Sequence, residues 1–243
     1  MQREKQRYDF LFLYTYITMK KQFFRPFVGK YYTRGIKGKK ILVIGASFYC
    51  NRVKCPYFAE CTNVDVKDSA PYDNICPEYV DEGKKLHLEP SYCVEDYAPQ
   101  TYQRFASYIG RFLGITDYDT IWQHMAFTNY VQFMLPADET CYRGTYLSDL
   151  SERDYEAFNE VLMELQPDIV VVWGSIINSQ LKECNQYLVD IKELQETNSY
   201  VCHLNMPGVD HPIVLINPYH PSSSAWYIAM EEFDNYFTNL INN

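Results

Sequence analysis

The chain has 243 residues, a hydrophobic fraction of 47% and a formal net charge of −9, which is enough sequence for one large domain with a sizeable core. No apolar run approaches the roughly 20 residues that span a bilayer, and no small-residue cleavage site follows the charged N-terminus, so neither a membrane protein nor a secreted one is predicted. We therefore expect a cytoplasmic protein without a membrane partner, whose eight cysteines are mostly reduced.

Positive charge is concentrated in the first 40 residues, which contain 11 of the 22 Lys and Arg and only two acids, Glu4 and Asp9. An acidic chain usually argues against a nucleic-acid partner, but a basic segment leaves a local phosphate-binding face open. The alternative is a solvated tail. We assign residues 1–38 to a basic, aromatic N-terminal extension, in which Met19 is an alternative start, and residues 39–243 to a single domain.

The first predicted core element is a strand over Lys39–Ser47. Its apolar run is continuous, which is typical of a parallel strand covered by helices on both faces. The following segment, about residues 50–90, contains Cys, Pro and Asp without periodicity and is interpreted as an insertion. A helix is predicted over Pro99–Leu113, with apolar residues on one face and Gly114 at its C-cap. The stretch AFTNYV, residues 126–131, ends the next core element.

The second half of the chain continues this alternation. Ser151 and Asp154 form a capping box at the start of an amphipathic helix, which Pro167 ends. Later elements are predicted as a buried strand at Ile169–Trp173, a helix from Ser175, a strand at Ile213–Ile216 and a helix over Ser224–Leu240. The order predicts a three-layer α/β/α sandwich around a mainly parallel sheet. In such folds ligands bind beyond the carboxyl ends of the strands, where the loops GASFYC, WGSIIN and NPYHPSSS stand.

Four segments in this order resemble the motifs of the uracil-DNA glycosylase superfamily. They are the loop Gly45–Cys50 after the first core strand, Asn129 in FTNYV, Trp173-Gly174-Ser175, and His220-Pro221-Ser222. The first loop is most similar to the Gly-Glu-Ser-His-Tyr motif of a bacterial branch. The resemblance covers roughly residues 40 to 235. It implies a glycosylase-like fold and a monomer that acts on DNA.

The resemblance also implies a role for each motif residue. An imidazole on a stiff turn, His220, would donate a hydrogen bond to the base oxygen on which charge collects as the glycosidic bond breaks. Asn129 would pair with the base edge, and Ser47 would position water. The alternatives are a turn histidine and an Asn that closes a strand. Contacts to substrate are further predicted for Gly45, Ala46, Phe48, Tyr49, Phe58, Ser175, Ser222 and Ser223. The serines could hold a phosphate or make local turn bonds.

Two carboxylates of the family pattern are missing. Ser47 stands in the place of the water-orienting Asp, and Ala46 stands in the place of the Glu that some branches use. A carboxylate is the natural group to hold the water and stabilise a sugar cation. Acids that could serve instead lie in the insertion: Asp65, Asp68 and Asp73. The other possibilities are a base that leaves easily and a protein that binds a base without cleaving it. Ser224 stands near the place of an intercalating Leu, which favours single-stranded or modified DNA.

Four cysteines cluster beside the first motif, at positions Cys50, Cys55, Cys61 and Cys76. Their spacing, C-x4-C-x5-C-x14-C, differs from standard zinc patterns. The sequence therefore predicts no cofactor, and free thiols or a local pair. A zinc or iron–sulfur cluster on these four residues is the alternative.

Overall fold

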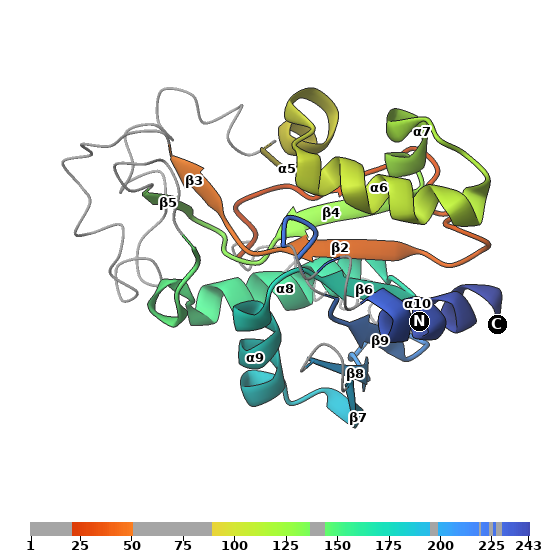
Figure 1. The fold of residues 1–243 in the computed structure, drawn as a ribbon. Helices are drawn as coiled ribbons and strands as arrows, with labels where there is room; N and C mark the ends of the chain where they lie inside the picture. The colour runs from red at the N-terminus through yellow and green to blue at the C-terminus, as the bar shows by residue number, and fades with distance from the viewer. Residues whose placement is uncertain are drawn as a thin grey trace, which may run out of the picture.

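The fold is built on a seven-stranded sheet in the order β1-β4-β2-β6-β9-β8-β7 (Figure 1). The computed structural model describes residues 21–50, 89–136, 144–194, 199–218, 220–223, 226 and 230–243. The strands of the sheet are β1 (Phe27–Val28), β2 (Ile41–Gly45), β4 (Met125–Asn129), β6 (Ile169–Val172), β7 (Leu188–Leu194), β8 (Ser199–Leu204) and β9 (Ile213–Ile216). A separate parallel pair is formed by β3 (Phe48–Cys50) and β5 (Met134–Pro136).

The sheet is mixed. The four central strands, β4, β2, β6 and β9, run parallel, whereas β1 joins one edge and β8 and β7 join the other in antiparallel pairs. Every residue of β2, β4 and β6 is buried, which explains the unbroken apolar sequences of β2 and β6. The predicted parallel character thus holds for the centre of the sheet. The predicted pattern did not include β7 and β8, because β7 mixes apolar and charged residues without the strict alternation that marks a strand.

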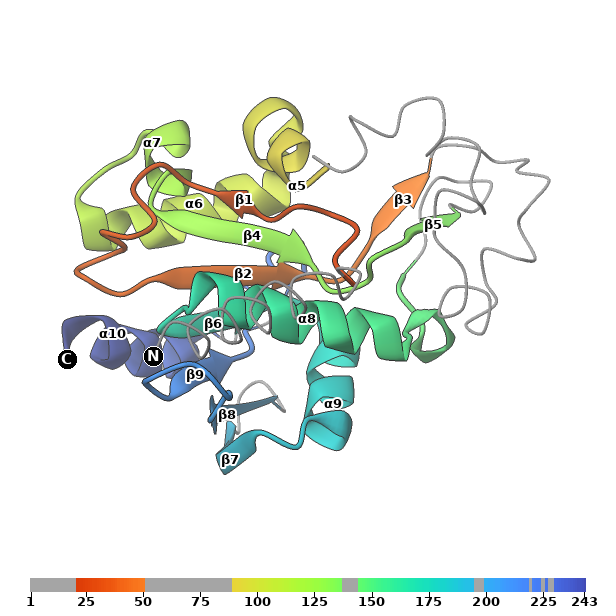
Figure 2. The same cartoon turned by 180° about the vertical axis from the view of Figure 1, so that it is seen from behind.

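Helices cover both faces of this sheet. The helical elements are α5 (Glu89–Ser91), the π-helical turn η2 (Tyr92–Tyr97), α6 (Gln100–Leu113), α7 (Tyr118–Trp122), the short η3 (Leu147–Asp149), α8 (Glu152–Leu165), α9 (Ser175–Cys184) and α10 (Met230–Asn242). Figures 1 and 2 place α6, α7 and α10 on one face and α8 on the other. The described part of the chain is therefore an α/β structure compatible with a three-layer sandwich. No helix within it is long and apolar enough to cross a membrane.

The two longest helices of the described chain, α6 and α8, begin and end close to the predicted residues. Pro99 is the N-cap of α6, and Gly114 closes it in the left-handed conformation with φ 67°. The Ser151 hydroxyl accepts a hydrogen bond from the Asp154 N–H, and the Asp154 carboxylate accepts one from the Ser151 N–H. The capping box predicted for α8 is thereby confirmed.

The described part of the predicted N-terminal extension belongs to the main body. β1 pairs with β4, and the N–H groups of Phe23 and Phe24 both donate to Gln132 Oε1, at 2.9 and 3.0 Å. The side chains of this segment that are buried in the core are Phe23, Phe24, Phe27, Tyr32 and Ile36. The boundary predicted at residue 38 therefore does not separate an extension from the domain. A two-residue strand has no periodicity from which it could be recognised.

Several basic residues of this segment lie at the amino end of β2. Lys30 and Arg34 both lie near the ring of Tyr31, with their cationic groups 5.4 and 5.1 Å from its centroid. Lys39 and Lys40 immediately precede β2. The loop that carries them is at the right of Figure 1, at the opposite end of β2 from β3. This position separates the charges of this loop from the carboxyl ends of the parallel strands.

Candidate active site

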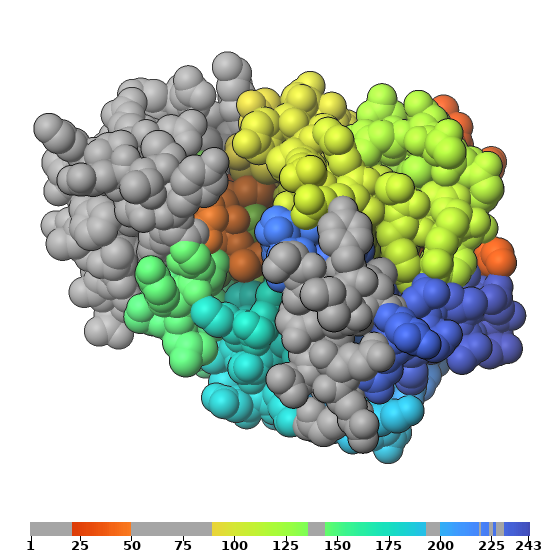
Figure 3. Space-filling view, in the orientation of Figure 1, coloured from red at the N-terminus to blue at the C-terminus, as the bar shows by residue number. Residues whose placement is uncertain are grey.

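A pocket of about 840 Å³ opens beyond the carboxyl ends of β2, β4 and β6. Figure 3 shows the hollow, with orange atoms of the segment after β2 at its base between the yellow α5–α6 region and the blue turn that follows β9. All four predicted motifs contribute to its lining, through Gly45–Tyr49, Asn129, Trp173–Ser175, and His220 with Ser222. The carboxyl ends of adjacent parallel strands meet at one edge of a sheet, which is why segments so distant in sequence converge.

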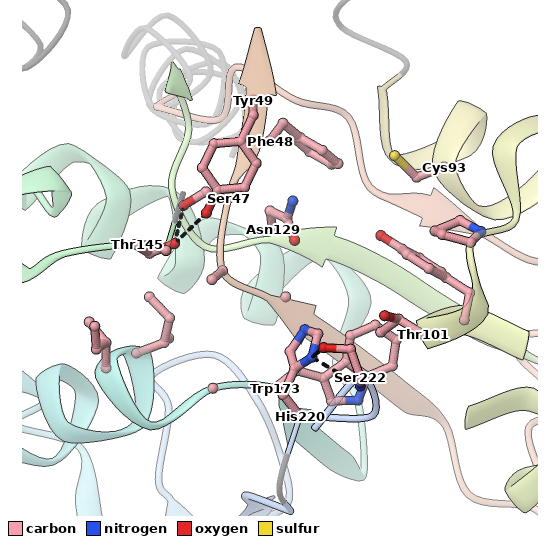
Figure 4. A pocket seen from close by; sticks show the side chains of 18 of the residues that line it. Ser47, Phe48, Tyr49, Cys93, Thr101, Asn129, Thr145, Trp173, His220 and Ser222 are labelled. Carbon is pink, nitrogen blue, oxygen red and sulfur yellow. Dashed lines mark hydrogen bonds between the residues drawn. The ribbon is translucent and has the colours of Figure 1, made fainter. Parts of the chain in front are cut away.

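Asn129 ends β4 directly opposite Gly45 of β2 in the sheet register. Its side chain is 4% exposed and lines the pocket, yet its amide makes no hydrogen bond to any residue that the structure describes. A Cβ atom at position 45 would collide with Asn129 Oδ1, so the glycine gives the amide its space. One donor and one acceptor group therefore face the cavity unpaired (Figure 4).

His220 lies across the same pocket, on the turn after β9. The Ser222 hydroxyl is 2.7 Å from His220 Nδ1, and the Ser222 N–H donates to the same nitrogen at 3.2 Å. Because a backbone N–H is only a donor, this network assigns Nδ1 as an acceptor and leaves the proton of a neutral ring on Nε2. Burial lowers the pKa of His220, which favours that neutral ring.

The His220 turn is held from two sides. The ring packs edge-on against Trp173, with centroids 5.9 Å apart. The Arg104 guanidinium donates to the carbonyl of Pro221 at 2.9 Å, and the Ser223 N–H donates to the His220 carbonyl at 2.8 Å. The imidazole is thus preoriented, with Nε2 free of any hydrogen-bond partner among the described residues.

Three hydroxyl groups form a cluster on another wall (Figure 4). Thr145 Oγ1 is 2.8 Å from Ser47 Oγ and 3.1 Å from the Tyr49 hydroxyl. The sequence analysis did not identify Thr145, which follows an irregular segment and carries no motif. Ser47 occupies the position predicted for it, but its hydroxyl is shared with a buried neighbour.

The described lining contains one carboxyl group, Glu89, which the sequence analysis also did not identify. The Cys93 thiol donates to Glu89 Oε1 at 3.9 Å. Burial raises the pKa of Glu89, and burial together with the nearby Glu89 charge raises the pKa of the Cys93 thiol to about 12. Cys93 is therefore a neutral thiol at ordinary pH and a poor nucleophile. The described lining residues include neither Lys nor Arg.

The rim beside Glu89 is aromatic. Tyr92 and Tyr97 are 49% and 63% exposed, and their rings stack at 6.2 Å with planes only 5° apart. Both belong to the π-helical turn η2, which Ala98 ends in the left-handed region at φ 40°. Short π-helical turns and non-glycine residues at positive φ are uncommon and concentrate at functional sites. Tyr102 continues this wall into the buried core.

The remaining predicted contacts divide into three groups. Ser175 lines the pocket as the exposed first residue of α9. Ser222 lines it as well, but its hydroxyl and N–H are engaged by the imidazole, and Ser223 is not among the lining residues. The predicted residues whose side chains lie outside the described part of the chain are Phe58, Ser224, Asp65, Asp68, Asp73, Cys50, Cys55, Cys61 and Cys76.

Within the described ranges, no group of three or more His, Cys, Asp or Glu side chains is placed to hold a metal ion. A scan against protein-family models and a search of curated proteins find no match for the chain.

Proposed function

We propose that this pocket takes a nucleobase flipped out of DNA and that the protein is a hydrolase of the glycosylase type. The observation that carries the proposal is the amide of Asn129, which faces the pocket without a hydrogen-bond partner among the described residues. A ligand with a complementary edge would pair with both its donor and its acceptor, each bond contributing about 0.5–1.5 kcal/mol. A nucleobase presents such a donor and acceptor pair on one edge.

His220 supports the second half of the proposal. Hydrolysis forms a bond between a water oxygen and the sugar C1′ while the C1′–N bond breaks, and the electron pair of that bond goes to the base. A neutral imidazole with its proton on Nε2 donates a hydrogen bond to a base oxygen without supplying a second charge. Such a preoriented donor stabilises the charge that develops on the departing base. Ser47, on the hydroxyl wall, positions the water.

The DNA itself reaches the pocket at the amino end of α9. Gly174 is the N-cap of this ten-residue helix and has no side chain to cap it, so a phosphate beside Ser175 would accept hydrogen bonds from the first N–H groups. Flipping costs a few kcal/mol in a duplex and least in a mismatched or single strand. Single-stranded or modified DNA is therefore the favoured partner, bound by one copy of the protein.

The second candidate function is a binding module that recognises a base and breaks no bond. The observation that favours it is the lack of a carboxylate in the loop Gly45–Tyr49, together with the contact between Ser47 and Thr145. A hydroxyl engaged in this way is a weak substitute for the group that normally orients water.

Oligonucleotides that carry uracil, hypoxanthine or a hydroxymethylated pyrimidine separate the two candidates. After incubation with the protein, alkali converts abasic sites into strand breaks. Breaks that disappear in His220→Ala and Asn129→Ala support the enzyme. Binding that depends on Asn129 without any breaks supports the module.

Matched controls come from positions outside the pocket. His211→Ala, beside Asp168 at the amino end of β6, and Asn235→Ala, on the exposed side of α10, should leave binding and cleavage unchanged. If neither binding nor cleavage depends on His220 or Asn129, the proposed base pocket is wrong.

A further inference from the structure

We infer that the base selected by this pocket carries a positive charge, as a ring alkylated on nitrogen does. This inference rests on the proposed function, because it names the class of base that the same pocket prefers. Three features of the described lining support it: a half-buried carboxyl without a cationic partner among the described residues, an electron-rich aromatic wall, and the lack of Lys or Arg.

Glu89 is the first of these features. Its only described hydrogen bond comes from a thiol, which is a weak donor, and no described Lys, Arg or His contacts it. Removing a carboxylate from water without a neighbouring cation disfavours its charged form. Burial accordingly raises the pKa of Glu89. A cationic ring in the pocket would compensate the charge. A neutral ring such as uracil leaves the cost in place.

The aromatic wall is the second feature. Tyr92, Tyr97 and Tyr102 line the pocket on the side of Glu89, and Phe48 and Trp173 line it from the loop after β2 and the end of β6. The face of an aromatic ring carries negative potential, so a flat cation stacked on it gains more than a neutral ring of the same area.

The chemistry of a cationic base removes the difficulty of the missing carboxylates. When the C1′–N bond of such a base breaks, the electron pair enters a ring that is already positive, and the base leaves neutral. The water oxygen bonds to C1′ and the surplus proton passes to solvent. No negative charge accumulates on this leaving group, so the hydrogen bond from His220 orients the ring instead of stabilising an anion, and a strongly activated water is not required. A hydroxyl at position 47 is sufficient for this reaction.

Two isomeric nucleosides test the charge preference directly. The ring of 3-methylcytidine is a cation at neutral pH, whereas 5-methylcytidine has the same atoms and a neutral ring. Titration calorimetry with the full chain should give at least about tenfold tighter binding of 3-methylcytidine, since stacking and carboxylate contacts both favour the cation. In a parallel assay, an oligonucleotide with N7-methylguanine should release its base faster than one with uracil, measured as free base by chromatography because alkali alone attacks N7-methylguanine.

Variants identify the origin of the preference. Glu89→Gln should reduce the ratio of the two affinities several-fold, mainly through weaker binding of 3-methylcytidine. The control is Glu95→Gln, which removes an exposed carboxylate on the neighbouring turn. It should change the affinity ratio little, because solvent screens that charge. Circular dichroism confirms that each variant is folded.

Each outcome is decisive. Equal affinity for the two nucleosides, or a preference for the neutral one, contradicts the inference and leaves the base pocket intact. A preference that survives Glu89→Gln unchanged contradicts the role of this carboxylate. If neither nucleoside binds and Asn129→Ala has no effect on oligonucleotide binding, the proposed function itself is wrong.

Discussion

The contact between Gly45 and Asn129 permits a prediction that separates function from stability. In Gly45→Ala, the new methyl group meets Asn129 Oδ1 at less than contact distance, and the next atoms, Asn129 Cγ and Phe127 Cε2, lie at 3.3 Å. The amide oxygen is the far end of a side chain and can rotate away. The strand backbone need not move. We therefore expect the amide to leave its position in the pocket while β2 and β4 stay paired.

The magnitudes follow from this geometry. Rotating one amide and shifting two neighbours by a few tenths of an ångström should cost about 1 kcal/mol of unfolding free energy, the lower part of the range for overpacking. The loss of a two-point contact to a base edge should cost about 1–3 kcal/mol of binding, or about 5- to 150-fold in Kd. Ligand affinity should thus fall more than stability does.

A double-mutant cycle measures the coupling. Fluorescence anisotropy with a labelled oligonucleotide gives Kd for the wild type, Gly45→Ala, Asn129→Ala and the double variant, and urea denaturation gives their stabilities. Because both substitutions remove the same amide contact, the double variant should bind about as weakly as Asn129→Ala alone. Additive losses would refute the reasoning, since they would mean that position 45 acts on the ligand independently of Asn129.

Three further predictions concern the structure around the pocket. Asn217→Ala removes the amide that donates to the carbonyls of Val172 at 2.7 Å and Gly174 at 3.2 Å. The unfolding free energy measured in urea should fall by about 1–3 kcal/mol. A smaller decrease would contradict the stabilising role of these two buried hydrogen bonds between the ends of β9 and β6. Ser151→Ala removes the α8 cap and should cost about 1 kcal/mol in thermal or urea unfolding, whereas Ser151→Asp should restore most of it. Burial lowers the pKa of His220 below its ordinary value of 6.5, so the unfolded state takes up the proton at a higher pH than the folded state does. The unfolding free energy should therefore be highest above pH 6.5 and should fall as the pH drops toward the pKa of the folded state. In a pH series of urea titrations, His220→Gln should lack this decrease.

The sequence predicts the centre of this fold well and its edges poorly. The strands with continuous apolar residues, such as Ile41–Gly45 and Ile169–Val172, are those buried on both faces, so their pattern and their position have one cause. Strand β7, the edge strand beside β8, carries Asp190, Lys192 and Glu193 among apolar residues. Helices and loops show the same mixture of apolar and charged residues. Its pairing with β8 is decided by tertiary contacts that a local pattern does not contain.

The residues of the candidate site likewise fall into those that the sequence predicts and those that it does not. Gly45, Asn129 and His220 could be predicted because each follows or ends a recognisable strand, and parallel strands bring such positions together. Glu89 and Thr145 could not be predicted. Each stands beside a stretch of sequence without periodicity, so no pattern indicates where its side chain lies. The five-residue spacing of Tyr92 and Tyr97 matches the π-helical turn and neither of the common periods.

Within the described part of the chain, the basic loop before β2 and the pocket that contains Glu89 lie at opposite ends of the parallel strands, which separates positive from negative charge. A polyanion encountering the protein at low ionic strength is drawn first to the amino end of the sheet, while a cationic ligand is guided toward the pocket mouth. Added salt should therefore slow the encounter with a small cation and weaken nonproductive contacts with nucleic acid at the same time. Rate constants recorded at one salt concentration would conceal these opposing effects.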